Sequence, residues 1–187
     1  MEVLSGKISE SKIKNYRTLK GLLRDNKFEH VGSGSYASCF GNKKSNYVIK
    51  VFQKGNDLAY WAYLKRIRKS KNPYVPKIHS VIEKRIGGRD YIIVILEKLI
   101  SWEDLPKEPL RETLDKHFGF EDIYSCFNKL HEDYFALNNK IKSLFKLLNN
   151  ICDKYGFSFD NHKFNIMYRK NGADYFPVFI DPLFNGN

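Results

Sequence analysis

The apolar residues from Ile123 to Tyr155 recur at spacings of three and four over more than thirty residues, and Gly156 follows them. This is the period of an α-helix with one buried face, and glycine commonly ends such a helix. The spacing therefore predicts a long amphipathic helix, in one piece or two, that ends at Gly156. We expect its apolar face to be core rather than a surface for a partner.

The first half of the chain follows another pattern, because its apolar residues form short runs rich in β-branched side chains. Such runs predict strands when turn residues separate them. After the third run, Asn56 or Asp57 can cap a helix that extends to about Lys69. Gly87 and Gly88 predict a turn between the last two runs. The five expected strands lie at 28–31, up to residue 40, at 47–52, at 77–84 and at 91–97.

These two patterns divide the chain into three parts. Residues 1–27 are expected to form an N-terminal helical extension, with a short amphipathic helix at 8–24. Residues 28–98 are expected to form a sheet lobe of five antiparallel strands and one helix. Residues 99–187 are expected to form a mainly helical lobe. The predicted class is α+β with two lobes. Further short strands are expected at 157–159, 166–169 and 176–180.

Composition excludes a membrane-spanning protein. The longest apolar run extends from Tyr91 to Leu96, whereas a spanning helix needs about 20 residues. The first residues, MEVLSGKISESKIKNY, lack the apolar stretch of a signal peptide. The three cysteines, Cys39, Cys126 and Cys152, are widely spaced, which argues against disulfides and structural zinc. We therefore expect a soluble cytoplasmic protein that does not bind membranes.

The net charge of +11 is concentrated in the first half of the chain. Residues 1–90 carry 20 Lys and Arg against 7 Asp and Glu, whereas residues 91–187 carry 12 against 14. No acidic residue lies between Asp57 and Glu83. A charged surface of this kind attracts an acidic protein face or nucleic acid, or is a solvated face that keeps the protein soluble. The basic segment consists of Lys65, Arg66, Arg68, Lys69, Lys71 and Lys77.

A glycine-rich turn and a lysine within a strand indicate phosphate binding. The turn Gly32-Ser33-Gly34-Ser35-Tyr36 lies between two expected strands, and glycines at this spacing let backbone N–H groups approach a phosphate. It is neither a Rossmann nor a Walker A loop, because a strand follows and no Gly-Lys-Ser/Thr closes it. Lys50 lies in the middle of an apolar run, so it must either reach the surface or meet an anion.

Two carboxylates and an amide form the next candidate group. Asp160 and Asn165 lie five residues apart in an expected loop, and Asp181 ends an apolar run. Together they offer oxygens to Mg²⁺ and one acceptor for the proton of a substrate hydroxyl. A single aspartate in a loop more often forms a turn, but an ordered set of three is harder to explain in that way.

The order of these groups resembles that of the protein-kinase family. In detail the chain is similar to the early Ser/Thr protein kinases of short-tailed bacteriophages, in the stretches VGSGSYASCF, NPYVPKIHSV, FDNHKFNIM and IDPLF. The resemblance extends from about Phe28 to Phe184. The matching residues are Gly32 and Gly34 of the glycine-rich loop, Lys50 of the third strand, Glu97 of the hinge, Asp160 and Asn165 of the catalytic loop, and Asp181 of the DFG motif.

This resemblance implies a two-lobed kinase-like fold and transfer of the γ-phosphate of ATP, with Mg²⁺, to serine or threonine of host proteins during host takeover, in the bacterial cytoplasm. It implies that Asp160 takes the proton of the substrate hydroxyl, that Asn165 and Asp181 hold Mg²⁺, and that Lys50 binds the α and β phosphates. The other nucleotide-binding residues that it implies are Gly32, Ser33, Gly34, Ser35, Tyr36, Glu97 and Lys163.

The sequence departs from the family pattern at several positions. Ala37 replaces the third glycine of the loop, and Ser-Phe-Asp160 replaces His-Arg-Asp. No glutamate lies in the helix after Lys50, where Asp57 is the only acid available. The chain ends six residues after Asp181, so we expect a minimal second lobe without an activation segment. Two alternatives therefore stay open: a weak or inactive kinase-like protein that binds and inhibits a host protein through its basic first lobe, and a small-molecule phosphotransferase.

Overall fold

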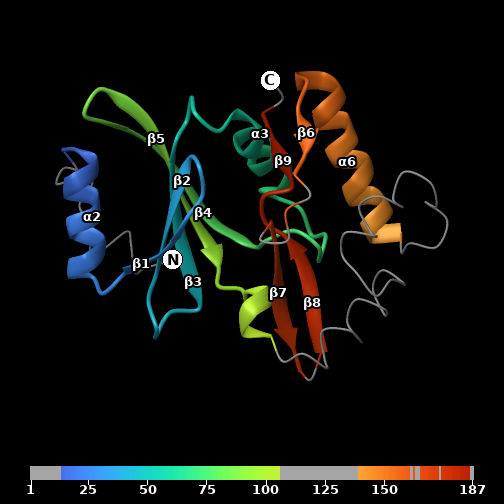
Figure 1. The fold of residues 1–187 in the computed structure, drawn as a ribbon, viewed down its shortest axis with the longest axis horizontal. Coiled ribbons are helices and arrows are strands. Elements are labelled where there is room, and N and C mark those ends of the chain that lie inside the picture. The colour runs from blue at the N-terminus through green and yellow to red at the C-terminus, as the bar shows by residue number, and fades with distance from the viewer. Residues whose placement is uncertain (1–13, 106–138, 161, 163–164, 173, 186–187) are drawn as a thin grey trace. The chain divides into compact units, whose positions relative to one another are not determined.

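The computed structural model describes residues 14–105, 139–160, 162, 165–172 and 174–185. The chain forms two compact units, whose helices and strands are labelled in Figure 1. Unit 1 comprises residues 1–58 and 77–98, and unit 2 comprises residues 59–76 and 99–187. Residues 59–76 thus group with the second half of the chain, although the sequence pattern assigns them to the sheet lobe. The three domain ranges expected from the sequence stay a prediction.

Unit 1 is built on one antiparallel sheet with the strand order β1-β2-β3-β5-β4. This confirms the five-stranded antiparallel sheet predicted from the short β-branched runs. The turn between the last two strands contains Gly87 and Gly88 at φ +56° and +80°, a conformation that glycine adopts without strain. The strands are β1 (Glu29–Ser33), β2 (Ala37–Gly41), β3 (Tyr47–Gln53), β4 (Ile78–Ile86) and β5 (Arg89–Glu97).

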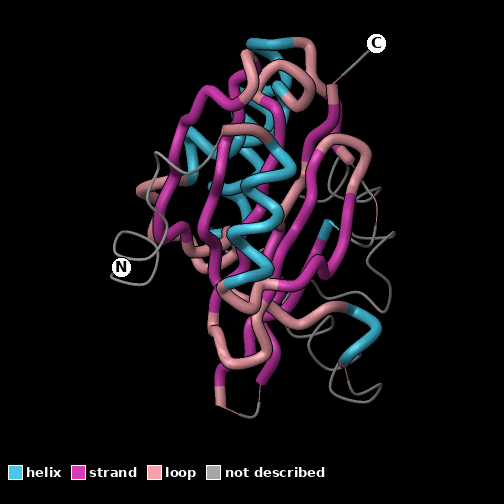
Figure 2. The backbone as a smooth tube through the Cα atoms, turned by 90° about the vertical axis from the view of Figure 1, so that its left-hand side faces the viewer, coloured by secondary structure: helices cyan, strands magenta, loops and turns pink. Residues whose placement is uncertain are grey.

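Helix α2 (Tyr16–Asp25) covers one face of this sheet, as Figure 2 shows. Its N-terminus is capped by Asn15, whose Oδ1 accepts a hydrogen bond from the N–H of Thr18 at 2.8 Å. Leu19 and Leu23 are buried in a core cluster with apolar residues of β2, β3, β4 and β5. The helix predicted at 8–24 is thus found from Tyr16 onward, and residues 8–13 lie outside the described part. The described part of the N-terminal extension therefore contributes to the core of unit 1.

Leu23→Ala tests this packing. Leu23 is 1% exposed, and replacing a buried leucine by alanine leaves a cavity that costs about 2–5 kcal/mol. We expect the free energy of unfolding, measured with urea, to fall by that amount. Leu58→Ala is the control, because Leu58 is 49% exposed and its replacement should change stability by no more than about 0.5 kcal/mol. Equal effects of the two substitutions would show that α2 does not stabilise unit 1.

In its described residues, unit 2 combines the helices α3 and α6 and the short 3-10 helix η2 with the small antiparallel strand pairs β6–β9 and β7–β8. Helix α6 begins at Asn139 within the described residues and ends at Tyr155, where Gly156 has φ +69° and its N–H donates to the carbonyl of Cys152. This confirms the predicted helix end, while the part of the apolar stripe before Asn139 lies outside the described residues. The elements are α3 (Leu58–Ile67), η2 (Trp102–Asp104), α6 (Asn139–Tyr155), β6 (Ser158–Phe159), β7 (Ile166–Asn171), β8 (Asp174–Phe179) and β9 (Leu183–Phe184).

Among the helices of the described ranges, none combines the length and the hydropathy that crossing a membrane requires.

Candidate functional site

The glycine-rich turn of unit 1 connects β1 and β2. Gly32 pairs with Cys39 across the two strands, and the N–H of Gly34 donates to the carbonyl of Ala37 at 3.0 Å. Residues 33–36, which include Ser33, Gly34, Ser35 and Tyr36, are all exposed. The turn therefore presents an exposed backbone of small residues, and Tyr36 at its end has 54% of its surface exposed.

Neither glycine of this turn is required by the surrounding structure. A Cβ atom built on Gly32 or Gly34 would meet no described atom within 4 Å, and neither residue has a positive φ. The fold described here therefore tolerates alanine at both positions. Glycine at these positions instead fits a cradle in which a phosphate approaches the backbone closely, where a Cβ would intrude. By this steric criterion, the glycine-rich turn fits the phosphates of a nucleotide.

Gly34→Ala should consequently weaken ATP binding without destabilising the protein. We expect affinity to fall about tenfold, the effect of one lost charge-assisted hydrogen bond, while the free energy of unfolding stays equal or rises by about 0.4–1 kcal/mol. Gly88→Ala is the matched control in the same unit, because its φ of +80° makes alanine strained. That control should lose about 1 kcal/mol or more of stability and keep its ATP affinity. The opposite result, in which Gly34→Ala is less stable but keeps its ATP affinity, would contradict a role of the turn in ATP binding.

Lys50 is a buried cation in the centre of the sheet. It lies on β3 between Cys39 of β2 and Val94 of β5, and it is 8% exposed. Its neighbours Ile49 and Val51 pack in the cluster beneath α2, so Lys50 lies on the opposite face because side chains alternate along a strand. Lys50 is not an edge-strand lysine in water, and a buried ammonium group requires a nearby anion or acceptor.

Asp57 is the one other buried charged side chain among the described residues, also at 8% exposure. Both Asp57 and Lys50 have interaction partners in the structure. The sequence pattern singles out Asp57 as the acid that could take the place of a helix glutamate, and its burial in the unit that holds Lys50 is consistent with that hypothesis.

Glu97 lies at the end of β5 and is hydrogen-bonded to the backbone of Lys77. Its Oε1 accepts a hydrogen bond from the N–H of Lys77 at 2.7 Å, and its own N–H donates to the carbonyl of Lys77 at 3.0 Å. The carboxylate therefore closes the open end of the β4–β5 pair. The contact of Glu97 with a nucleotide stays a prediction.

In unit 2, the structure brings Asp160, Asn165 and Asp181 together. The N–H of Asp160 donates to the carbonyl of Pro182 at 2.9 Å, and the carbonyl of Asn165 accepts from the N–H of Ile180 at 2.8 Å. Each of the two loop residues is thus bonded through its backbone to a direct neighbour of Asp181. All three are half-buried, so their oxygens can be both held by the fold and reached by a ligand.

Short strand pairs explain this arrangement. Phe159 of β6 pairs with Leu183 of β9, which holds the residues that follow Phe159 beside those that precede Leu183. Within the loop, the Oδ1 of Asp160 accepts a hydrogen bond from the N–H of His162 at 3.2 Å, an Asx turn that orients the carboxylate. Lys163, the other residue predicted in this loop, lies outside the described residues.

The donor set of these residues fits Mg²⁺. Over the part of the chain that the structure describes, no three His, Cys, Asp or Glu side chains gather as a metal cluster would require. Asn165 and Asp181 instead supply one amide and one carboxylate oxygen, hard donors of the kind that Mg²⁺ accepts. Magnesium is commonly held by one or two carboxylates, with phosphate and water oxygens completing the octahedron. The site therefore suits a metal that arrives with a phosphate.

Tyr63 is a positioning residue that the sequence pattern does not single out. It is fully buried in α3, and its hydroxyl donates to the carbonyl of Phe179 at 2.7 Å, two residues before Asp181. Burial raises the pKa of Tyr63 well above its usual value, and electrostatic interaction with Tyr60 and Asp181 raises the pKa further. The phenol therefore stays protonated and holds the end of β8 against α3.

Arg169 and Asn185 make two further contacts of this kind. The guanidinium of Arg169 donates to the carbonyls of Pro73 and Val75, at 2.7 and 3.1 Å. The Oδ1 of Asn185 accepts from the N–H of Ala59 at 2.9 Å, at the beginning of α3. Both join segments of unit 2 that are far apart in the sequence.

Comparison with known proteins finds similarity among solved structures. No family model matches the sequence, and no curated protein matches it. The fold is similar to a crystal structure of Rad53 (1–466) in complex with AMP-PNP, with a TM-score of 0.44 and 15% sequence identity. The alignment covers 89% of this chain. This chain spans 42% of that one.

Proposed function

We propose that this protein is an ATP-dependent protein kinase that phosphorylates serine or threonine. The observation that carries the proposal is the meeting of Asp160, Asn165 and Asp181 through the backbone bonds beside Asp181. These three residues have the order and the chemistry that phosphoryl transfer requires: an acceptor for the proton of a hydroxyl, and two oxygen donors for Mg²⁺. Loops that served only to form turns would not require two carboxylates and an amide in this arrangement.

Each residue has a defined task in this proposal. Asp160 accepts the proton of the substrate hydroxyl, and its carboxylate is held for that by the Asx turn. Asn165 and Asp181 hold Mg²⁺, which when bound neutralises the charge of the phosphates. Lys50 binds the α and β phosphate oxygens. The remaining proposed contacts with ATP come from Gly32, Ser33, Gly34, Ser35, Tyr36, Glu97 and Lys163.

The proposed substrates are proteins of a bacterial host, phosphorylated in its cytoplasm. This part of the proposal rests on the sequence stretches that resemble the early kinases of short-tailed bacteriophages, above all FDNHKFNIM and IDPLF. The alternative acceptor class is a small molecule, because a phosphotransferase uses similar residues.

Incubation with labelled ATP and bacterial lysate, with and without Mg²⁺, tests the proposal. We expect label in protein bands that requires Mg²⁺, together with a rise of the melting temperature in MgATP. Label confined to the low-molecular-weight fraction would identify a small-molecule phosphotransferase. Neither label nor a thermal shift at millimolar MgATP would contradict both enzymatic functions.

The second candidate is a kinase-like protein that binds an acidic host protein without phosphorylating it. Two observations favour it: the described residues of α3 contain no glutamate, and the side chains of Lys65, Arg66, Arg68, Lys69 and Lys71 are all exposed. An exposed basic surface without neighbouring acids attracts an acidic partner over long range.

Reversing Arg66, Arg68 and Lys69 to Glu should slow association with such a partner, more at low salt than at moderate salt. The measurement is pull-down from lysate at two ionic strengths. The control variant replaces Arg17, Lys20 and Arg24 of α2 by Glu. These residues are also exposed, and the control changes the net charge of the protein by the same amount. If both variants retain all partners, the basic segment serves solubility alone.

A further inference from the structure

Unit 2 has a pocket that lies apart from the candidate site and shares with the groups discussed so far only Lys71 of the basic segment and Val75, whose carbonyl accepts from Arg169. Its volume is about 340 Å³, and it lies between the loop that follows α3 and the first described turns of α6. Its polar wall comes from Ser70, Lys71 and Asn72 on the loop and from Lys140 and Ser143 on the helix. Two lysines and two serines thus line one small space, and the hydroxyl of Ser143 donates to the carbonyl of Lys140 at 2.8 Å.

The pocket is rigidly built, because the side chain of Asn72 joins its two walls. Its Nδ2 donates to the carbonyl of Lys140 at 2.7 Å and to the Oγ of Ser143 at 3.1 Å, and its Oδ1 accepts from the N–H of Tyr74 at 3.0 Å. The same loop is held from its other end by Arg169, through the carbonyls of Pro73 and Val75. A site held in advance by such contacts loses little entropy when a ligand binds.

The donors in this pocket suit an anion. The Oγ of Ser70 accepts a hydrogen bond from the N–H of Asn72 at 3.1 Å, an arrangement that leaves the hydroxyl proton for another acceptor. Lys71 is exposed and Lys140 is exposed, so their ammonium groups can turn toward the pocket. Hydroxyl and ammonium donors of this kind form charge-assisted hydrogen bonds with phosphate oxygens.

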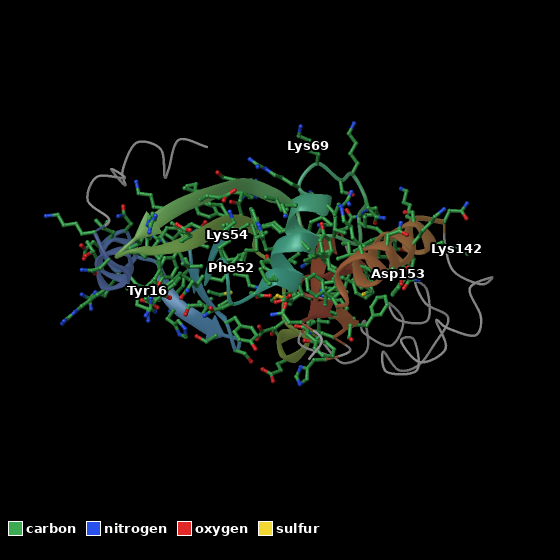
Figure 3. All side chains as sticks on the ribbon, turned by 90° about the horizontal axis from the view of Figure 1, so that it is seen from above. Tyr16, Phe52, Lys54, Lys69, Lys142 and Asp153 are labelled. Carbon is green, nitrogen blue, oxygen red and sulfur yellow. The ribbon has the colours of Figure 1, made fainter. Side chains whose placement is uncertain are left out.

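The two described segments that line the pocket are rich in basic residues. Residues 65–76 contain five basic side chains and residues 139–152 contain three, and neither segment contains an acidic residue. Figure 3 shows two of these side chains, Lys69 and Lys142, pointing away from the ribbon on the loop and on α6. Basic side chains of these two segments attract anions.

An apolar wall and the lack of stacking surfaces limit the kind of anion. Val75 and Leu144 are buried, and Leu147 is half-buried beside them, so the pocket offers a phosphate ester a contact for its carbon atoms. Single-stranded nucleic acid is usually bound by aromatic side chains on which bases stack. No aromatic residue is among the described residues that line this pocket.

We propose that this pocket binds the phosphate monoester of a phosphorylated serine or threonine side chain on a peptide. Lys71 and Lys140 bind the dianion, Ser70 donates to it, and the apolar wall contacts the side-chain carbons. This goes beyond the proposed phosphoryl transfer and requires no ATP, so its failure and the failure of the kinase assignment are separate results.

Isothermal titration of the full chain with a blocked pentapeptide, one phosphoserine between alanines, tests the proposal. We expect one site per chain and no heat from the unphosphorylated peptide. Lys71→Met and Lys140→Met should each weaken binding by about 10- to 100-fold, because each removes one hydrogen bond to a charged group. Lys146→Met is the matched control: it removes the same charge from an exposed position of α6 that does not line the pocket, and its effect should stay below about threefold.

Several outcomes would overturn the assignment. These are no binding at millimolar peptide, an equal loss in the Lys146→Met control, or tighter binding of a single-stranded oligonucleotide than of the phosphopeptide. Inorganic phosphate is expected to compete more weakly than the peptide, because it cannot contact Val75 and Leu144, and equal competition would also contradict a site for a phosphorylated side chain. Circular dichroism and thermal unfolding of each variant confirm that the chain is folded.

Discussion

Asp160→Asn is expected to lower the rate of phosphoryl transfer to protein by about 10²–10⁴-fold, the usual contribution of a general base. The carboxylate can take a proton from a hydroxyl, whereas the amide cannot. The fold should persist, because the bond to the carbonyl of Pro182 uses the backbone N–H of Asp160. The side chain also keeps an Oδ1 that can accept from the N–H of His162. Transfer of label from ATP to lysate proteins measures the effect.

Asp153→Asn is the control for this experiment. Asp153 lies on α6 in the same unit, is exposed, and undergoes the same change of side chain. We expect full labelling with this variant, and for Asp160→Asn a melting temperature equal to that of the wild type. Equal labelling by both variants would show that Asp160 is not the general base.

Asp181→Ala is expected to abolish the part of ATP affinity that depends on Mg²⁺, a loss of at least about tenfold. The carboxylate is the one charged donor of the proposed metal site, and an alanine leaves Asn165 alone to hold the ion. The frame should remain, because the bonds at Ile180 and Pro182 that surround this position use backbone atoms. Isothermal titration with ATP, in the presence of Mg²⁺ and of EDTA, measures the metal dependence.

For each variant, the ATP affinity measured with Mg²⁺ is compared with the affinity measured in EDTA. In EDTA, Asp181→Ala should bind ATP as the wild type does or slightly better, because a negative charge beside the phosphates has been removed. Asp153→Ala provides the control in the same unit. A variant that keeps the same ratio of affinities with and without Mg²⁺ would exclude Asp181 as a metal ligand.

The sheet of unit 1 and helix α6 could be predicted because their signals are local. The run from Tyr47 to Phe52 is rich in β-branched residues, and a pair of adjacent glycines marks the turn between β4 and β5. The apolar positions of α6 repeat with the helical period. In each case the residues that determine the element lie within a few positions of each other, so burial and backbone preference act in the same direction.

The contacts that hold the candidate site could not be predicted in this way. Strand β9 has two residues, Leu183 and Phe184, which is too short for any periodic pattern. The hydroxyl of Tyr63 meets the carbonyl of Phe179 across 116 positions of the chain, and the sequence holds no signal for that pairing. The pattern from Asp160 to Asp181 indicates which side chains have suitable chemistry, but these distant contacts determine where those side chains lie.

The interrupted course of unit 2 has a consequence for the order in which the chain folds. Its first segment ends at Pro76 and its next begins at Leu99, with β4 and β5 between them. The two bonds between Lys77 and Glu97 bring the ends of that insertion together. Joining the same ends across a flexible loop of about 20 residues would cost on the order of 2–3 kcal/mol of chain entropy. Once the hairpin forms, that loss has already occurred, so the part of unit 2 that ends at Pro76 and the part that begins at Leu99 start to pack with their ends already close together.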